Sequence, residues 1–185
     1  MPMPIAQAML QELEQEAPAT QRVLERVPDA HLDWRPHPKS FSLGQLAMHV
    51  AQIPGGVATL AMQSPATPPE FVQEPARRSA DLVPTLHESI KTAKSVLGRA
   101  SDDTMMETWR LVAGERELMA MPRAALLRAI MLNHWYHHRG QLLVYLRQLN
   151  IPVPSVYGPS ADENPFAIPS ESKAAAAGAA SIQAT

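Results

Sequence analysis

Two histidines in the last third of the sequence are spaced so that they could bind one metal ion. His134 and His138 lie four residues apart, and on a helix this spacing places both side chains on one face, one turn apart. The same spacing holds zinc in helical H-E-x-x-H proteases, although no glutamate follows His134 here. The pair therefore predicts either a metal site or two core histidines that bond to neighbouring side chains or carbonyls.

The residues around the pair predict that both imidazoles face the protein interior. Apolar residues recur at intervals of three and four along this segment, which is the pattern of one buried helix face. They are Leu127, Ile130, Met131, Leu142, Tyr145 and Leu149. A buried polar group without a partner costs about 1–3 kcal/mol, so inward imidazoles require partners. His49 falls on the apolar face of another predicted helix, where a metal ligand and a hydrogen-bonded core histidine are both open interpretations.

Four stretches of the sequence have the apolar periodicity of long helices. They span residues 5–27, 43–53, 80–100 and 122–149. Pro18 predicts a kink or a break in the first helix, and the Pro-Gly-Gly run at 54–56 predicts one just after the second. Ser40 or Ser42 can cap the second helix. With no strand patterns of comparable length, the sequence predicts an all-α four-helix bundle.

The connections between these helices are rich in proline. Three prolines rule out regular structure over residues 28–39, and Trp34 is expected to pack this loop onto the bundle. Four prolines between residues 65 and 75 predict a long crossover loop. Residues 104–122 have no clean period, so we expect irregular structure with a short helix or a hairpin there.

The C-terminal part of the chain differs in composition from the bundle. Residues 1–160 are predicted to form the bundle domain, and residues 161–185 a largely disordered extension. From Glu171 onward the chain is rich in Ala, Ser and Gly and has almost no large apolar residue. Such a segment cannot bury enough apolar surface to offset the entropy of ordering it. Residues beyond about Ser170 are therefore expected to be dispensable.

Composition excludes several classes of function. The formal net charge is −2 and the pI is about 6.4, which gives no electrostatic basis for binding nucleic acid or an anionic membrane. The absence of cysteine excludes disulfides, thiolate metal ligands from the chain and a cysteine nucleophile. No apolar run approaches the roughly 20 residues of a membrane span, and the start lacks the pattern of a secretory signal. A cytoplasmic location is expected.

Two motifs, in this order, resemble those of the DinB/YfiT-like superfamily of metalloenzymes. They are Ser42-x-Gly44-Gln45-Leu46-x-x-His49 and Asn133-His134-x-x-x-His138-Arg139-Gly140-Gln141, with a Trp34-Arg35-Pro36 turn before the first. The resemblance covers most of the chain, from the first helix to about Tyr157. It implies a four-helix bundle with a long crossover connection and a homodimer. It also implies one divalent metal ion, with zinc or nickel expected, held by His49, His134 and His138.

Neighbouring residues bear on this ligand set. His137 is three residues from His134 and could compete with His138, but the register of the Arg-Gly-Gln motif favours His138, and His137 then points about 100° away. Each ligand imidazole is expected to donate its other N–H to an acceptor. Gln45, Asn133 and Gln141 are the candidates for that role.

The resemblance implies an enzyme, whose most favoured activity is thiol-dependent S-transfer or isomerisation of small electrophiles. In that reaction a low-molecular-weight thiol binds the metal as thiolate, which replaces the cysteine that the chain lacks. One alternative is a metal-dependent hydrolase, although Glu115 and Glu117 are only weak candidates for a general base. The other alternative is a non-enzymatic, stress-induced protein that binds a metal or another ligand.

Overall fold

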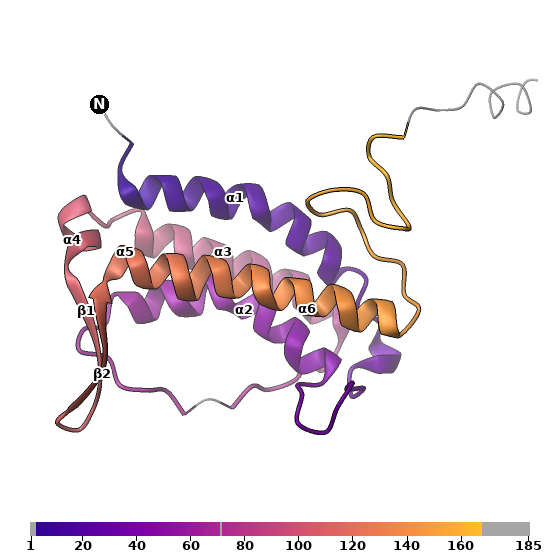
Figure 1. Cartoon of the computed structure of the whole chain (residues 1–185), viewed down its shortest axis with the longest axis horizontal. Helices are drawn as coiled ribbons and strands as arrows, with labels where there is room; N and C mark the ends of the chain where they lie inside the picture. Colours follow the sequence, from indigo (N-terminus) through magenta and orange to yellow (C-terminus); the bar gives the residue numbers. More distant parts are fainter. Residues whose placement is uncertain (1–2, 71, 168–185) are drawn as a thin grey trace, which may run out of the picture. The chain divides into compact units, whose positions relative to one another are not determined.

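Four helical segments form the first of two units in this computed structural model, which describes residues 3–70 and 72–167 (Figure 1). The first unit spans residues 1–153 and contains every helix and strand among the described residues. The second unit spans residues 154–185, whereas composition placed the start of the C-terminal extension at residue 161. The disorder expected from Glu171 onward falls outside the described residues.

The bundle confirms the predicted all-α architecture with a long crossover. Its helices are α1 (Ile5–Leu24), α2 (Leu43–Ala61), α3 (Leu82–Leu97) and a last helix made of α5 (Arg123–Leu126), the π-helical segment η3 (Leu127–Asn133) and α6 (His134–Gln148). Helix α2 packs against α3 and α6, and α1 packs against the same two helices. Residues 62–78 form the crossover, which returns along α2 before α3 begins (Figure 1). Each described helix is too short or too polar to span a lipid bilayer.

The predicted breaks at the two helical prolines do not occur, because α1 continues through Pro18 and α2 continues through Pro54 to Ala61. A proline inside a helix leaves the carbonyl four residues earlier without its usual donor. For Pro54 that carbonyl belongs to Val50, and it accepts a hydrogen bond from the indole Nε1 of the buried Trp135 at 2.9 Å. For Pro18 the carbonyl belongs to Glu14, which is exposed, so this carbonyl can meet water.

The start of α2 is fixed by Ser42, one of the two predicted caps. The Ser42 hydroxyl accepts a hydrogen bond from the Gln45 amide at 3.2 Å, and the Gln45 side chain accepts one from the Ser42 amide at 2.9 Å. This reciprocal pair is a capping box, which satisfies two of the free amides at a helix start. Trp34 lies edge-on to Tyr145 with ring centroids 5.6 Å apart, so the loop before α2 contacts the last helix as expected.

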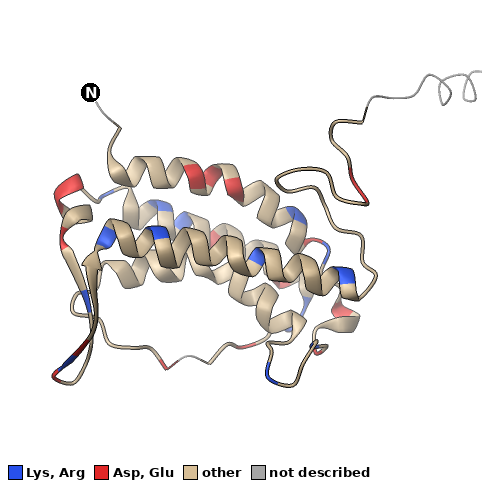
Figure 2. Cartoon of the chain, viewed as in Figure 1, with Lys and Arg blue, Asp and Glu red and all other residues tan. Residues whose placement is uncertain are grey.

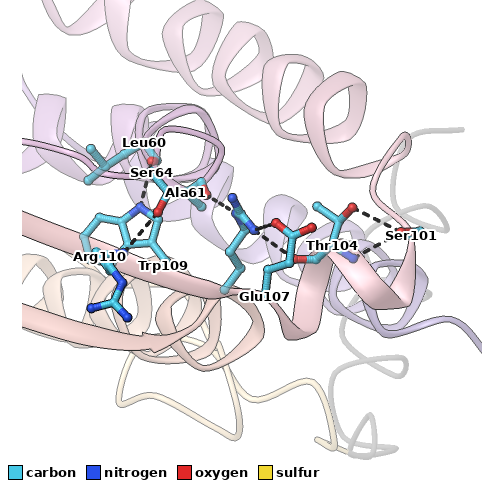
Figure 3. A network of polar contacts seen from close by, with 9 residues as sticks. Leu60, Ala61, Ser64, Ser101, Thr104, Glu107, Trp109 and Arg110 are labelled. Atoms are coloured by element: carbon cyan, nitrogen blue, oxygen red, sulfur yellow. Dashed lines mark hydrogen bonds and ion pairs between the residues drawn. The ribbon is translucent and has the colours of Figure 1, made fainter.

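Residues 104–122 contain part of a short helix and a whole hairpin. Helix α4 (Asp102–Met106) is followed by antiparallel strands β1 (Thr108–Ala113) and β2 (Arg116–Pro122). The hairpin is bonded to the end of α2: the indole of Trp109 donates to the carbonyl of Leu60 at 3.2 Å, and the amide of Arg110 donates to the hydroxyl of Ser64 at 3.3 Å (Figure 3). The hairpin and the start of the crossover therefore close one end of the bundle.

The buried face of α6 differs from the predicted stripe by about one residue. The fully buried positions are Trp135, Arg139, Leu142 and Leu146, whereas His134 and His138 are half-buried at the edge of this face. The π-helical turn of η3 holds more residues than an α-helical turn. The residues after η3 therefore lie on a different helix face from the one that a constant 3.6-residue period predicts for them. The predicted stripe ran straight through η3: its members Leu127, Met131 and Leu142 are fully buried, but its two histidines lie next to the buried positions rather than at them.

Arg139, a residue of the second sequence motif, is a buried charge that joins α6 to α1. Its guanidinium donates to a carboxylate oxygen of Glu16 at 2.7 Å and to the hydroxyl of Thr20 at 2.9 Å. Acidic residues gather in the middle of α1 and basic residues are spread along the last helix (Figure 2). A second pair, Arg128 of η3 with Glu12 of α1 at 2.6 Å, links the last helix to α1 at the surface.

Candidate metal centre

The bundle brings together the three histidines that the sequence singled out. His49 comes from α2, and His134 and His138 come from the first turns of α6. One nitrogen from each ring lies within 4.8 Å of the other two, and the Nε2 atoms of His49 and His134 are 3.0 Å apart. The ring centroids of His134 and His138 are 4.4 Å apart, as expected for two side chains one helical turn apart. Within residues 3–70 and 72–167, no other group of His, Cys, Asp and Glu could hold a metal ion in this way.

The tautomer of His49 is set by Gln73, a buried residue of the crossover. The Gln73 amide nitrogen donates to the carbonyl of Glu74 at 3.0 Å and to the side-chain oxygen of Gln52 at 3.3 Å. Its oxygen therefore faces the Nδ1 of His49, 3.0 Å away, and accepts a hydrogen bond from the Nδ1–H group. With the proton on Nδ1, the lone pair of Nε2 is directed at His134.

His138 has an equivalent partner on its own helix. Its Nδ1 lies 2.7 Å from the side-chain oxygen of Gln141, which leaves Nε2 as the nitrogen available to an ion. Metal-ligating histidines commonly use the second nitrogen in this way, because the hydrogen bond fixes both the tautomer and the ring orientation.

The three predicted acceptors have different positions. Gln141 contacts a ligand imidazole, whereas Gln45 forms the capping box and donates its amide nitrogen to the Gln73 carbonyl at 2.9 Å, so it supports His49 only indirectly. Asn133 is exposed and makes no hydrogen bond to an imidazole of the described histidines. His137 is also exposed, and its ring centroid lies 5.1 Å from that of His138.

Gln73 is the site residue that the sequence analysis missed. It lies 24 positions after His49, in a proline-rich segment where no periodicity assigns a face to any residue. Its one local signal is its position just before the end of the crossover. There the chain returns to the start of α2, where the amide of Ala76 donates a hydrogen bond to the carbonyl of Gly44 at 3.2 Å.

Burial keeps all three imidazoles neutral at physiological pH. It is the largest cause that lowers the pKa of His49, of His134 and of His138, and for His138 the value falls to about 4. The neighbouring imidazoles lower these pKa values further, because protonation of one opposes protonation of the next. Neutral imidazoles offer a lone pair to an ion without first releasing a proton.

The donor set and its spacing suit a divalent metal ion. Zinc binds imidazole nitrogens at about 2.0–2.1 Å, so two tetrahedral ligand nitrogens lie about 3.4 Å apart. The 3.0 Å between the Nε2 atoms of His49 and His134 is close to that separation, and the candidate nitrogens of all three rings lie within 4.8 Å of one another. Three neutral nitrogen ligands suit zinc, nickel, copper and iron alike, so the donor set does not select one of these metals.

A pocket of about 510 Å³ opens beside His49 and His134. We call it the apolar pocket, because its walls are mainly aliphatic: Ile53, Val57 and Leu60 from α2, Ile130 from η3 and Pro69 from the crossover. No described residue that lines it is Asp, Glu, Lys or Arg. A molecule in this pocket would lie next to an ion held by the histidines.

Comparison with known proteins places the chain in one family. The DinB family model matches residues 1–170. A protein of Bacillus subtilis strain 168, described as "Uncharacterized protein YrdA", is 28% identical over 159 residues, which cover 83% of this chain and 89% of that protein.

Solved structures of similar proteins have the same fold. A DinB-like protein from Bacillus cereus ATCC 10987 superimposes with a TM-score of 0.63 at 22% identity, covering 80% of this chain and 95% of that one. YfiT from Bacillus subtilis superimposes with a TM-score of 0.58 at 15% identity, covering 78% of this chain and 87% of that one. YfiT is described as "a probable metal-dependent hydrolase with an unusual four-helix bundle topology".

Proposed function

This chain belongs to the DinB family, and from that premise we propose that it is a metal-dependent enzyme that uses one divalent ion to activate a small nucleophile. The proposal rests on one observation: three neutral imidazoles from α2 and α6 converge beside a pocket without charged walls. Catalytic zinc sites typically have three protein ligands, which leave a coordination position open. The set of His49, His134 and His138 has this composition.

The chain's own residues would divide the work as follows. His49, His134 and His138 bind the ion, and Gln73 and Gln141 hold two of these rings in the tautomer that presents Nε2. Three neutral ligands leave the full charge on the ion, which lowers the pKa of a bound thiol or water and polarises a carbonyl. The aliphatic walls of the apolar pocket keep bulk water away from the electrophile.

The favoured nucleophile is the sulfur of a low-molecular-weight thiol. No cysteine occurs in the chain, and no carboxylate among the described residues lines the apolar pocket to serve as a general base for water. In the transfer, a bond forms between sulfur and an electrophilic carbon, the bond from that carbon to its leaving group breaks, and the thiol proton passes to solvent. Hydrolysis is the second candidate, because it is the activity in the description of the structurally similar YfiT.

The test begins with metal analysis of the purified protein and of variants at the candidate ligands. His134→Ala and His138→Ala should lose stoichiometric metal, whereas His137→Ala, a change of the exposed neighbouring histidine, should retain it. Retention of metal by His138→Ala together with its loss in His137→Ala would reassign the ligand. Absence of bound metal under all loading conditions would overturn the proposal.

The activity assay separates the two candidate reactions. Conjugation of 1-chloro-2,4-dinitrobenzene to glutathione, bacillithiol or mycothiol should proceed above background with the metal-loaded protein and be lost in His138→Ala. Cobalt-substituted protein should change its visible spectrum when the active thiol is added. If no thiol changes that spectrum while 4-nitrophenyl acetate is hydrolysed in a metal-dependent way, hydrolysis replaces transfer. If metal binds and neither reaction occurs, the protein is a metal-binding protein without these activities.

A further inference from the structure

Two adjacent glycines of α2 have opposite surroundings. A Cβ added to Gly55 would lie 2.7 Å from the carbonyl oxygen of Ser89 on α3, so close packing of the two helices requires glycine there. A Cβ added to Gly56 would meet nothing within 4 Å. Glycine is a poor helix former, and contact with a neighbouring helix does not account for Gly56.

Gly56 lies in the middle of the stripe of α2 that lines the apolar pocket. His49, Ile53 and Leu60 follow the same stripe at intervals of four and seven residues. Gly56 is exposed and lies at a rim that this pocket shares with a second hollow beside α3, so a large side chain at position 56 would narrow the mouth of the apolar pocket. The missing side chain contributes to a volume of about 510 Å³, within the range of small-molecule sites.

The residues that line the apolar pocket disfavour a charged ligand. Apart from the two histidines, its polar side chains are uncharged: three glutamines and Thr59, whose hydroxyl donates to the carbonyl of Gly55 at 2.8 Å. Apart from an ion held by the histidines, the pocket has no charged lining residue, so a charged ligand group would lose its water shell here without an oppositely charged side chain, which is strongly unfavourable.

One wall carries a hydrogen-bond donor for the ligand. The side-chain oxygen of Gln52 accepts from the amide nitrogen of Gln73, which fixes the orientation of the Gln52 amide. Gln52 is exposed at the edge of the pocket, and no described residue accepts a hydrogen bond from its NH₂ group, so this group can donate to water or to a bound molecule. The donor therefore suits a carbonyl oxygen of a bound molecule.

We propose that the electrophilic substrate is an uncharged, mainly aliphatic molecule, bound in the apolar pocket with a carbonyl group at Gln52. That the bound molecule is a substrate rests on the proposed function. The ligand class itself follows from the pocket walls, so binding can be measured without turnover.

The test compares three six-carbon probes that differ in charge: hexanamide, hexanoate and hexylammonium. Binding is followed through the NMR signals of isoleucine, leucine and valine methyl groups, first in the protein as purified and then after chelation, so that coordination of hexanoate to a metal does not contribute. Hexanamide should bind at least tenfold more tightly than either charged probe to the chelated protein, with shifts at Ile53, Val57 and Ile130. Equal or tighter binding of a charged probe, or no binding of hexanamide, would overturn the proposal.

Matched variants locate the binding. Gly56→Leu should narrow the mouth of the apolar pocket and weaken hexanamide binding at least tenfold without changing metal content. Gly140→Leu is the control, because Gly140 is also helical, has no atom within 4 Å of an added Cβ and does not line the pocket. Gln52→Leu should weaken hexanamide binding by roughly threefold to tenfold, the effect of one neutral hydrogen bond, while Gln148→Leu on the exposed surface of α6 should not.

The outcomes separate this inference from the proposed function. A protein that takes up metal and catalyses transfer, but binds hexanamide equally well with Leu at position 56, would overturn only the substrate assignment. A protein that never takes up metal but retains the preference for hexanamide would overturn only the proposed enzyme activity.

Discussion

Gln73 connects the crossover to the candidate metal centre through its side chain. Its oxygen fixes the protonated nitrogen of His49, its amide nitrogen bonds to Gln52 and Glu74, and its main-chain carbonyl accepts from Gln45. A residue that fixes the tautomer of a ligand imidazole typically changes metal affinity by 10–100-fold when it is lost.

Gln73→Leu should therefore weaken metal binding by about 10–100-fold. Leucine has a similar size but cannot accept the proton of His49 Nδ1. Competition against a chromophoric chelator measures the affinity, and Gln63→Leu, a change of an exposed glutamine that lines the same pocket, should leave it unchanged. Equal affinity in wild type and Gln73→Leu would show that the tautomer of His49 does not depend on this contact.

The metal-free protein should lose stability in mild acid through His138. Burial lowers the pKa of its imidazole to about 4 in the folded state, against about 6.5 in an unfolded chain. Between these values the unfolded chain binds a proton that the folded protein excludes, so the free energy of unfolding falls as pH falls from about 6.5 to about 4. Above pH 6.5 this contribution is fully present.

Urea denaturation of chelated protein at a series of pH values measures this dependence. His138→Gln should make the decline between pH 6.5 and 4 shallower. His37→Gln, in an exposed loop, serves as the control and should retain the slope of the wild type. An identical slope in His138→Gln would exclude His138 as the source.

The sequence predicted the three histidines that the structure brings together, but not all the residues that hydrogen-bond to them. His134 and His138 share a helix, so helical spacing alone relates them, and their spatial proximity follows. His49 was related to them by resemblance to a family pattern. The contact of Gln73 with His49 depends on the path of an irregular loop, which no periodic pattern encodes, and the structure was needed to find it.

At the scale of helices, the ion pair of Arg139 and Glu16 stabilises the contact between α6 and α1. The two side chains are 2% and 18% exposed, so the pair is largely desolvated. Removing one partner of a buried pair leaves the other charge uncompensated, at a cost of about 3–5 kcal/mol. Arg128 and Glu12 join the last helix to α1 but are 49% and 34% exposed, a setting in which ion pairs contribute about 0–1 kcal/mol.

Arg139→Met should therefore lower the free energy of unfolding by about 3–5 kcal/mol, and Arg128→Met by less than about 1 kcal/mol. Denaturant unfolding measures both. Adding Glu16→Leu to Arg139→Met should restore part of the loss, because it removes the unpaired carboxylate. A loss in Arg139→Met no larger than that in Arg128→Met would contradict the assigned role of the buried pair.

Adjacent substitutions in α2 should have opposite effects on stability. Gly55→Ala places a methyl group against the backbone of Ser89, which cannot yield, and should destabilise the protein by about 1–3 kcal/mol. Gly56→Ala meets open space and should stabilise α2 by about 0.5–1 kcal/mol. Thermal melts of the two variants measure the difference, and a change of the same sign in both would show that the packing of α2 on α3 is misassigned.

The sequence predicted helices well where apolar residues follow a regular period. The ends of α1, α2 and α3 lie within a few residues of the prediction except where proline suggested an early stop to α2. The prediction there was a kink or an interruption, and α2 is not interrupted: the indole of Trp135, 85 positions away, donates to the carbonyl that Pro54 leaves without its usual donor. The π-helical segment η3 departs from the 3.6-residue period of an α-helix, so a fixed period misplaced the buried face of α6 by about one residue.

For the whole molecule, metal binding and folding should be linked. The three candidate ligands come from two helices that are separate in sequence, so only the folded bundle presents them together. An ion that binds the native state alone stabilises it by about 2.7 kcal/mol at a concentration 100 times its Kd. The melting temperature should rise with added zinc or nickel in the wild type and stay constant in His134→Ala. An equal rise in both would place the stabilising ion elsewhere.

The separation of the candidate ligands along the chain also sets the delay between their appearances during protein synthesis. His49 precedes His134 by 85 positions, and a ribosome adds roughly 5–20 residues per second, so about 4–17 s pass between the emergence of the two imidazoles. During that interval the nascent chain carries one member of the set, and a single imidazole holds a metal ion weakly. Under the proposed function, the protein therefore acquires its ion after the last helix has been synthesised and has docked.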